Sequence, residues 1–424
     1  MSNRDNDSEA SINRWLEGIP EGISRKRRRG LVSPGNNNKM SAPPDDGTPR
    51  PLKRVRSNLA SDLSDRSRSL SSLRSSDKSS RRNSPQRQLQ QLRLNPKGIR
   101  FQPLSSFTSK PSSLESLLDA IDDITEGKGI VPERMREQLM QEPHEDFKWA
   151  RRSSHYYSAD LEYSPSPDDV LEVLDAANEC DSRHHAEVTW NAEVHQLVLG
   201  LAFRQGRRCK FRHLVNFTNT TVASIMPEYG IPTTSKKVDF CIYIDPENDD
   251  ETWKSLEPSV VALQIALPEN ALNFTDFIPL DRRPIALSIE TKKPSEGFEG
   301  AKVQLSVWLL AQWTFLRCLA KPPGSSGGEG EGDREEEHGA GSWTELLPAF
   351  LPGIIIQGHD WHLIITTPEG EDMIFWGKVT IGSTSSSKGI YRIIRTLQVL
   401  REWAKESYWP YFQDLITKTA ERLG

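Results

Sequence analysis

The stretch that decides the fold is IALSIETKK, residues 285–293. Apolar residues alternate with small or polar ones, which predicts a β-strand, because successive side chains of a strand point to opposite faces. Glu290 and Lys292 are two residues apart, so they project from one face, about 6.6 Å apart along the chain. A carboxylate beside an ammonium group suits a divalent cation and a water molecule that is to be deprotonated. The simpler interpretation is a salt-bridged pair on a half-exposed strand.

Two segments before this strand carry further carboxylates. Residues 238–244 alternate in the same way and predict a strand with Asp239 at its start, where a carboxylate is costly unless it has a partner or a metal ion. An amphipathic helix is predicted over residues 186–203, with Glu193 at the edge of its apolar stripe. A strand-end cap and a solvated rim residue are the simpler roles of these two acids. Together with Glu290 and Lys292, they are expected to converge as in a metal-dependent phosphoryl-transfer site.

The order of these elements, followed by a long apolar helix over residues 301–319, resembles the PD-(D/E)XK nuclease superfamily. The resemblance covers about residues 115–424. The sequence around the motifs is similar to that of uncharacterised fungal PD-(D/E)XK nuclease-like proteins. Those proteins also carry a basic disordered N-terminus and a short Trp-Leu helix. The resemblance implies an α/β fold, with a restriction-endonuclease-like mixed sheet of αβββαβ core order flanked by helices.

The resemblance also implies roles for single residues. Asp239 and Glu290 would bind Mg²⁺ or Mn²⁺, Lys292 would orient the attacking water, and Glu193 would be an accessory acid. Gln304 is similar to the glutamine of a Gln-x-x-x-Tyr element in exonuclease-type members, although this chain has tryptophan in place of the tyrosine.

Three features depart from the family pattern. Valine instead of proline precedes Asp239, and residues 245–284 are expected to loop out as an insertion between two strands. Residues 101–424 contain 32 Lys and Arg against 49 Asp and Glu, a net charge of -17, which disfavours a duplex-binding groove unless basic residues gather locally. Such a patch is expected from Arg204, Arg207, Arg208, Lys210 and Arg212, with Lys236, Lys237, Lys292 and Lys293 nearby in motif order.

The N-terminal part has the opposite charge. Residues 1–100 contain 22 Lys and Arg against 10 Asp and Glu, a net charge of +12. The first 110 residues are rich in Ser and Arg and almost free of aromatic residues, which predicts a disordered basic tail before a domain over residues 111–424. Basic clusters at residues 25–29 and 53–56 are typical of a nuclear-import signal, and a solvated tail is the alternative. We therefore expect the protein in the nucleus.

Two short segments differ from their surroundings. Ile12, Trp15, Leu16 and Ile19 share one face of a predicted helix over residues 11–20, which would dock either on a protein partner or on its own domain. Residues 322–341 consist mainly of Gly, Ser and Glu and predict a disordered acidic insertion.

The composition disfavours several other classes of protein. The first ten residues lack the apolar core of a signal peptide, and the longest apolar stretch, residues 303–320, is interrupted by polar residues and predicts a buried helix instead of a membrane span. The four cysteines form no CxxC pair, which argues against a zinc finger or a disulfide framework. His184, His185 and His195 lack ligand spacing and are predicted to be exposed helix residues. A soluble intracellular protein without membrane contact is expected.

Three functions stay open at this point. The first is Mg²⁺-dependent hydrolysis of nucleic-acid phosphodiester bonds, which the set Asp239, Glu290 and Lys292 favours. The second is a catalytically inactive nuclease fold that serves as a nuclear nucleic-acid or protein-binding module, which the acidic charge of the domain favours. The third is a regulator whose main function lies in the Trp15 helix.

Overall fold

The computed structural model describes residues 84–95, 98–158, 163–204, 209–231, 236–321 and 343–423. These residues belong to one unit of the chain, and the other unit, Glu21–Lys78, lies outside the described residues. The predicted helix at residues 11–20, the two basic clusters and the acidic insertion at 322–341 also lie outside them.

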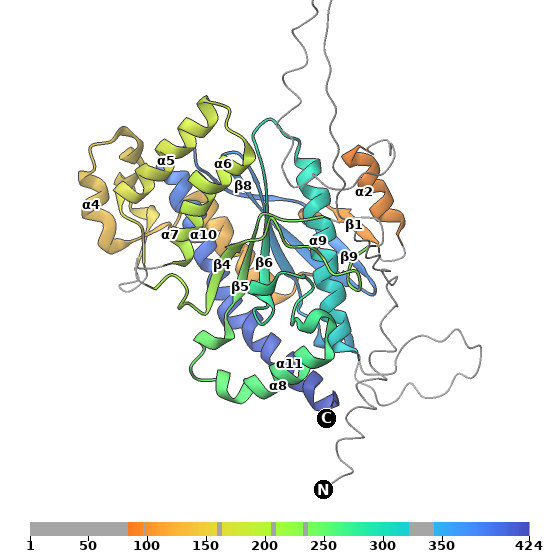
Figure 1. Ribbon diagram of the computed structural model, residues 1–424. Helices are drawn as coiled ribbons and strands as arrows, with labels where there is room; N and C mark the ends of the chain where they lie inside the picture. Colours follow the sequence, from red (N-terminus) through yellow and green to blue (C-terminus); the bar gives the residue numbers. More distant parts are fainter. Residues whose placement is uncertain are drawn as a thin grey trace, which may run out of the picture. The chain divides into compact units, whose positions relative to one another are not determined.

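An eight-stranded mixed sheet forms the centre of the fold (Figure 1). The strand order is β1-β9-β8-β7-β6-β5-β4, and β10 pairs with β8. Strands β4, β5 and β6 are antiparallel neighbours, whereas β6 and β7 are parallel. The strands are β1 (Ile99–Gln102), β4 (Val215–Asn219), β5 (Phe240–Ile244), β6 (Ile285–Lys292), β7 (Leu351–Gln357), β8 (Asp360–Glu369), β9 (Asp372–Trp376) and β10 (Val379–Ser383), with β2 (Val131–Pro132) and β3 (Tyr156–Tyr157) in a separate two-stranded sheet.

Helices lie on both sides of the sheet. On one side are α9 (Phe298–Ala320), which connects β6 to β7, and α2 (Pro85–Leu94); on the other are α5 (Pro167–Ser182), α6 (Glu187–Trp190), α7 (Gln196–Phe203) and α10 (Ser387–Trp403) (Figure 1). Helix α8 (Trp253–Ala266) packs against α11 (Trp409–Leu423). The remaining helical elements used below are α3 (Ser112–Glu126), α4 (Arg136–Gln141), the 3₁₀ turns η4 (Glu145–Arg151) and η5 (Ser153–His155), and the π-helical turn η6 (Asn191–His195). None of the described helices is long and apolar enough to span a membrane.

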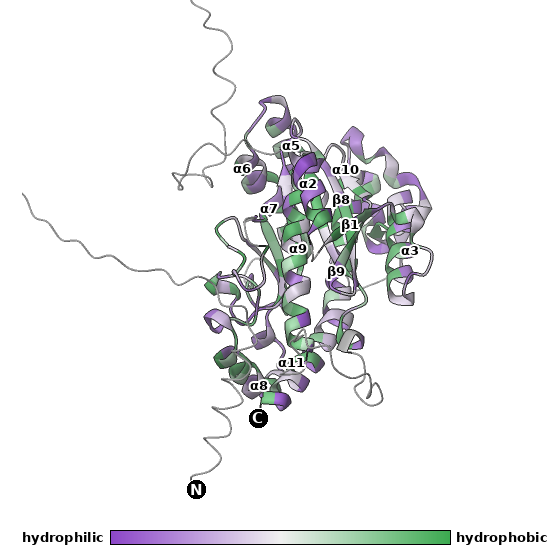
Figure 2. Ribbon diagram, turned by 90° about the vertical axis from the view of Figure 1, so that its right-hand side faces the viewer, coloured by the Kyte–Doolittle hydropathy of each residue, from purple (hydrophilic) through white to green (hydrophobic). Residues whose placement is uncertain are grey.

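Strand β6 is buried along its entire length because helices cover both of its faces. Alternate side chains of β6 therefore face the helical layers on the two sides of the sheet. On the α9 side, Trp308 donates a hydrogen bond from its indole N–H to Ser288 Oγ (3.0 Å). Gly353 of β7 allows α9 to approach, since a Cβ there would lie 3.1 Å from Leu305. In Figure 2 the strands and α9 are largely hydrophobic, whereas α2 and α5 carry strongly hydrophilic residues.

The predicted fold class is confirmed. The elements α7, β4, β5, β6, α9 and β7 occur in αβββαβ order, with α8 inserted between β5 and β6, and the mixed sheet lies between helices. The predicted helices over residues 186–203 and 301–319 and the predicted strand over 285–292 are present, although η6 interrupts the first helix.

The expected boundary between tail and domain at residue 110 is wrong. Helix α2 buries Leu89 and Leu92, and β1 forms an edge strand parallel to β9 in which Ile99 is fully buried. An edge strand gains its stability from backbone hydrogen bonds and a few apolar side chains, so a polar composition conceals it. The fold therefore includes residues 84–110 wherever they are described.

Three details of the domain also differ from the expectation. Residues 245–284 do not simply loop out, because they contain α8, whose Leu256, Val260 and Leu263 are buried. Strand β4 was not predicted, since its sequence Val-Asn-Phe-Thr-Asn is short and half polar. Residues 373–381 are apolar enough to be expected as one strand, but they belong to two strands, β9 and β10, which pair with different parts of β8.

Candidate active site

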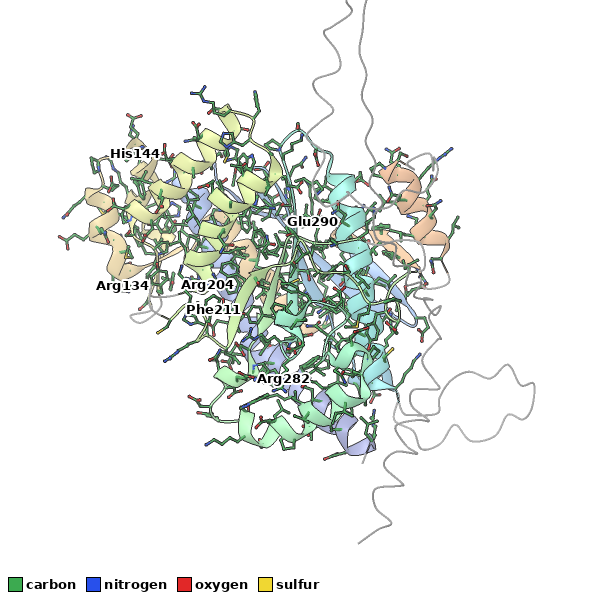
Figure 3. All side chains as sticks on the ribbon, in the orientation of Figure 1. Arg134, His144, Arg204, Phe211, Arg282 and Glu290 are labelled. Carbon is green, nitrogen blue, oxygen red and sulfur yellow. The ribbon has the colours of Figure 1, made fainter. Side chains whose placement is uncertain are left out.

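The predicted acids of the two central strands meet at one end of the sheet. Glu290 and Lys292 lie at the C-terminal end of β6, and Asp239 immediately precedes β5. Because β5 runs antiparallel to β6, with Phe240 opposite Ile289, the start of one strand meets the end of the other. Figure 3 places Glu290 in the interior, between the helices of the two sides.

Lys292 is the charged centre of this cluster. Its Nζ lies 2.6 Å from Glu290 Oε1 and 3.2 Å from Glu187 Oε2, and it donates to the backbone oxygen of Thr291 (2.7 Å). Burial lowers the pKa of Lys292, but the charges of Glu290 and Glu187 outweigh this effect, so the pKa lies above its usual value. Lys292 is therefore a cation throughout the neutral pH range.

Glu290 is the most deeply buried acid of the cluster, with no exposed surface. Burial raises its pKa well above the usual value, and the charge of Asp239 adds to this, while Lys292 acts in the opposite direction. Its second oxygen, Oε2, is buried and accepts no hydrogen bond from the residues that the structure describes. A buried carboxylate oxygen without a partner is unfavourable, so this atom favours a ligand that brings positive charge.

Asp239 is fixed from two sides. Its Oδ1 accepts a hydrogen bond from Asn191 Nδ2 (3.1 Å), and its Oδ2 accepts one from the backbone N–H of Thr291 (2.9 Å). Burial raises the pKa of Asp239, whereas Lys292 and these hydrogen bonds lower it. The contacts set the direction in which the carboxylate points, which is the property a metal ligand needs.

Glu193 is not part of the cluster, contrary to the expectation. It is exposed, and its charge acts on Cys180 of α5. On a helix, Glu193 is two positions from Asn191 and therefore points to a different side. Glu193 is therefore a solvated residue at the rim of the helix, as in the simpler interpretation.

Glu187 and Asn191 take the place that was expected for Glu193. Burial raises the pKa of Glu187 to about 7, against the opposing charge of Lys292. The signal was available in the sequence, because Glu187, Asn191 and His195 are spaced by four residues and so share one helix face. His195, predicted to be exposed, is fully buried and lies 2.8 Å from Asn191 Oδ1 through its Nδ1.

Gln304 lies next to the cluster. Its Nε2 donates to the backbone oxygen of Lys237 (3.2 Å), two residues before Asp239. This contact ties α9 to the segment that carries the aspartate, so Gln304 supports the site through the backbone.

The expected basic patch is only partly available for a ligand. Arg204 donates to the backbone oxygen of Phe217 (2.7 Å) and stacks on the Phe217 ring (3.8 Å), and in Figure 3 it lies beside Phe211, apart from Glu290. Arg207 and Arg208 lie outside the described residues. Lys236 remains close to the cluster: burial lowers its pKa and the charge of Glu290 raises it.

The residues present fit a hydrated divalent cation. Within the described residues, no three His, Cys, Asp or Glu side chains form a metal-binding group by themselves. However, Mg²⁺ is usually held by one or two carboxylates together with water and substrate phosphate oxygens. Asp239 and Glu290 supply two carboxylates at one place, and the unpartnered Glu290 Oε2 supplies a free position.

Comparison with known proteins gives one match. Residues 134–409 match the family model of the PD-(D/E)XK nuclease superfamily, which covers well over half of the chain and contains the entire cluster. No curated protein and no solved structure matches the chain.

Proposed function

The chain belongs to the PD-(D/E)XK nuclease superfamily, and on this basis we propose that it hydrolyses phosphodiester bonds of nucleic acid with Mg²⁺ or Mn²⁺ bound to Asp239 and Glu290. The observation that carries the proposal is the buried cluster in which Lys292 lies 2.6 Å from Glu290, and Asp239, just before β5, accepts a hydrogen bond from Thr291 at the end of β6. The cation, when bound, would polarise the phosphodiester and lower the pKa of a water molecule.

The protein's own side chains would then place and stabilise the reacting groups. Lys292 is permanently charged, so it would hold the attacking water and stabilise the negative charge that grows on the phosphate. Glu187, 3.2 Å from the Lys292 ammonium, would hold that side chain in place. Asn191 and Thr291 would hold the Asp239 carboxylate.

A cleavage assay with the full chain tests this function. Single-stranded and duplex DNA and RNA would be incubated with Mg²⁺, with Mn²⁺ and with EDTA. We expect cleavage only with metal and a loss of at least about 100-fold in Asp239→Asn, because removal of a catalytic electrostatic partner typically has effects of this size. Asp414→Asn is the matched control, since Asp414 is an exposed partner of Lys418 on α11. Cleavage in EDTA, or equal cleavage by wild type and Asp239→Asn, would contradict the proposal.

A catalytically inactive binding module is the second candidate. It is favoured by the net charge of -17 over residues 101–424 and by the hydrogen bond that engages Arg204 with Phe217 of β4. Under this alternative, the chain would bind nucleic acid or protein in the nucleus, with the Ile12, Trp15, Leu16 and Ile19 face as the protein contact. Metal-dependent binding without product formation in the same assay would favour it.

A further inference from the structure

A group of basic side chains lies at the N-terminal end of α10, outside the candidate active site. Lys388 and Arg392 belong to the first turns of α10, and Arg152 lies between η4 and η5. Lys388 passes close to the end of α3, since a Cβ on Gly127 would lie 2.7 Å from its Nζ. These three cations, Lys388, Arg392 and Arg152, are called the α10 cluster below.

The α10 cluster has no acidic counterpart within the described residues. None of its members forms an ion pair with a described carboxylate. Asp146, the carboxylate at this helix end, accepts a hydrogen bond from the backbone N–H of Ser387 and so caps α10. Burial lowers the pKa of Lys388, and the charges of Arg392 and Arg152 lower it further. Folding therefore brings like charges together without an ion pair to offset them, although Lys388 also lies beside the C-terminal end of α3, where the helix dipole favours a cation.

Two further observations favour an anionic ligand at the cluster. The positive end of a helix dipole disfavours cations, yet the first turn of α10 contains Lys388 and no acidic residue. In addition, Arg392 Nε is buried and donates to no acceptor in the described part of the chain. An anionic oxygen at this place would satisfy the Arg392 donor and offset the repulsion among the three cations.

The register of the sheet relates the cluster to the active site. In the register of the sheet, Lys292 of β6 lies opposite Gln357 of β7, and Gln357 lies opposite Asp360 of β8. Asp360 in turn lies opposite Ser383 of β10, the strand that precedes α10. These are three strand spacings, about 14 Å, along the same end of the sheet. Phosphates of a duplex strand rise about 3.4 Å each, so about four nucleotides span the distance from Lys292 to Ser383, five residues before Lys388.

We propose that the α10 cluster binds backbone phosphates of a nucleic acid several nucleotides from the bond held at Asp239 and Glu290. The choice of nucleic acid rests on the proposed function and on the shared sheet end. Contacts of this kind carry no sequence information, so the cluster would fix the register of the substrate and strengthen binding to any sequence.

The test measures binding by the full chain in EDTA, where metal-dependent hydrolysis cannot interfere. Fluorescence anisotropy would follow labelled single-stranded and duplex oligonucleotides of about 20 nucleotides, two helical turns, over a range of KCl concentrations. The double variant Lys388→Gln/Arg392→Gln is compared with Lys254→Gln/Lys418→Gln, which removes the same charge from α8 and α11. The basic N-terminal residues contribute equally to every variant, so the difference isolates the cluster.

We expect the cluster variant to bind about tenfold more weakly at 0.1 M KCl, with a salt slope shallower by about 1.4 to 1.8 for two lost phosphate contacts. Its melting temperature at low salt should equal or exceed that of wild type, because repulsion is removed. If the double variant does not fold, Lys388→Gln provides the same comparison with half the change in slope.

Other results would overturn the inference. These are binding equal to wild type, no nucleic-acid binding by wild type, or a loss confined to vesicles of anionic phospholipid, which would reassign the cluster to a membrane surface. Binding in EDTA is measured without hydrolysis, so it is independent of the cleavage assay. If the chain binds through the α10 cluster but cleaves nothing in the cleavage assay, only the proposed function is refuted. A chain that cleaves without using the cluster would refute only this inference.

Discussion

The pKa of Glu187 rises to about 7, because burial opposes its ionisation and Lys292 offsets only part of that effect. The folded state holds the proton of Glu187 more tightly than the unfolded state, where the pKa is near 4.5. The contribution of Glu187 to the free energy of unfolding is thus fully present below pH 4.5 and is lost as the pH rises to 7.

Glu187→Gln should remove this pH dependence. In EDTA, the stability of the variant relative to wild type should rise between pH 4.5 and 7 and then level off, with a total change of about 3 kcal/mol, from 1.36 kcal/mol per pKa unit. Urea unfolding at several pH values measures it. Glu193→Gln is the matched control on the same helical segment, and a pH profile of Glu187→Gln that follows this control would contradict the assignment.

Metal binding should depend on the two carboxylates and not on the lysine. A cation that binds only the folded protein stabilises it by about 2.7 kcal/mol at 100 times its Kd, so Mn²⁺ should raise the melting temperature of wild type. Asp239→Asn and Glu290→Gln should abolish this rise, since each removes a ligand. Lys292→Gln should retain the rise and lose cleavage. An equal rise in wild type and both carboxylate variants would leave the cluster as a structural ion pair.

At the scale of elements, β1 and α2 extend the domain toward the N-terminus. Ile99 is fully buried against the sheet, whereas Leu94, five residues earlier, is 85% exposed. Ile99→Ala should therefore lower the free energy of unfolding by about 2–5 kcal/mol, the usual cost for a buried isoleucine.

Leu94→Ala should change that free energy by less than about 0.5 kcal/mol, as is typical of surface positions. Thermal or urea unfolding of the two variants distinguishes them. A small effect of Ile99→Ala would show that β1 contributes little to the fold and would restore the boundary near residue 110.

The turn η6 shows how one irregular element shapes the site. In this π-helical turn His195 Nδ1 lies 2.8 Å from Asn191 Oδ1, and Asn191 Nδ2 donates a hydrogen bond to Asp239 Oδ1. Such turns are often found at functional sites. A helical-wheel argument locates the face that Glu187, Asn191 and His195 share, but it does not predict the π-helical turn.

At the scale of the whole molecule, charge is divided between the two parts of the chain. The first 100 residues carry +12 and the remainder -17. Long-range attraction of nucleic acid would therefore come from the N-terminal residues, and local clusters such as the α10 cluster would position the substrate. At physiological salt the Debye length is about 8 Å, so only charges that are concentrated close to the bound substrate act on it there.

The basic clusters at residues 25–29 and 53–56 lead to a prediction about localisation. A fluorescent fusion of residues 1–110 should accumulate in nuclei, because runs of Lys and Arg are typical of import signals. Replacement of both clusters by alanine should distribute the fusion through the cell. A fusion that is cytoplasmic with the clusters intact would refute the nuclear assignment.

Sequence periodicity was enough to identify the central strands and the long helix. The alternation in residues 285–292 and 238–244 predicted β6 and β5, and the distance of two residues between Glu290 and Lys292 placed them on one face. These inferences succeed because strand geometry is local and repeats every two residues.

Only the tertiary structure decided which side chains complete the cluster. Asn191 and Glu187 reach Asp239 and Lys292 across 48 and 105 residues of sequence, and β1 is stabilised by β9 across more than 270 residues. Such contacts depend on how elements pack and on where a helix is locally distorted, and neither property is encoded in a short window of sequence. Local pattern therefore determined the motif, and long-range packing determined its partners and its burial.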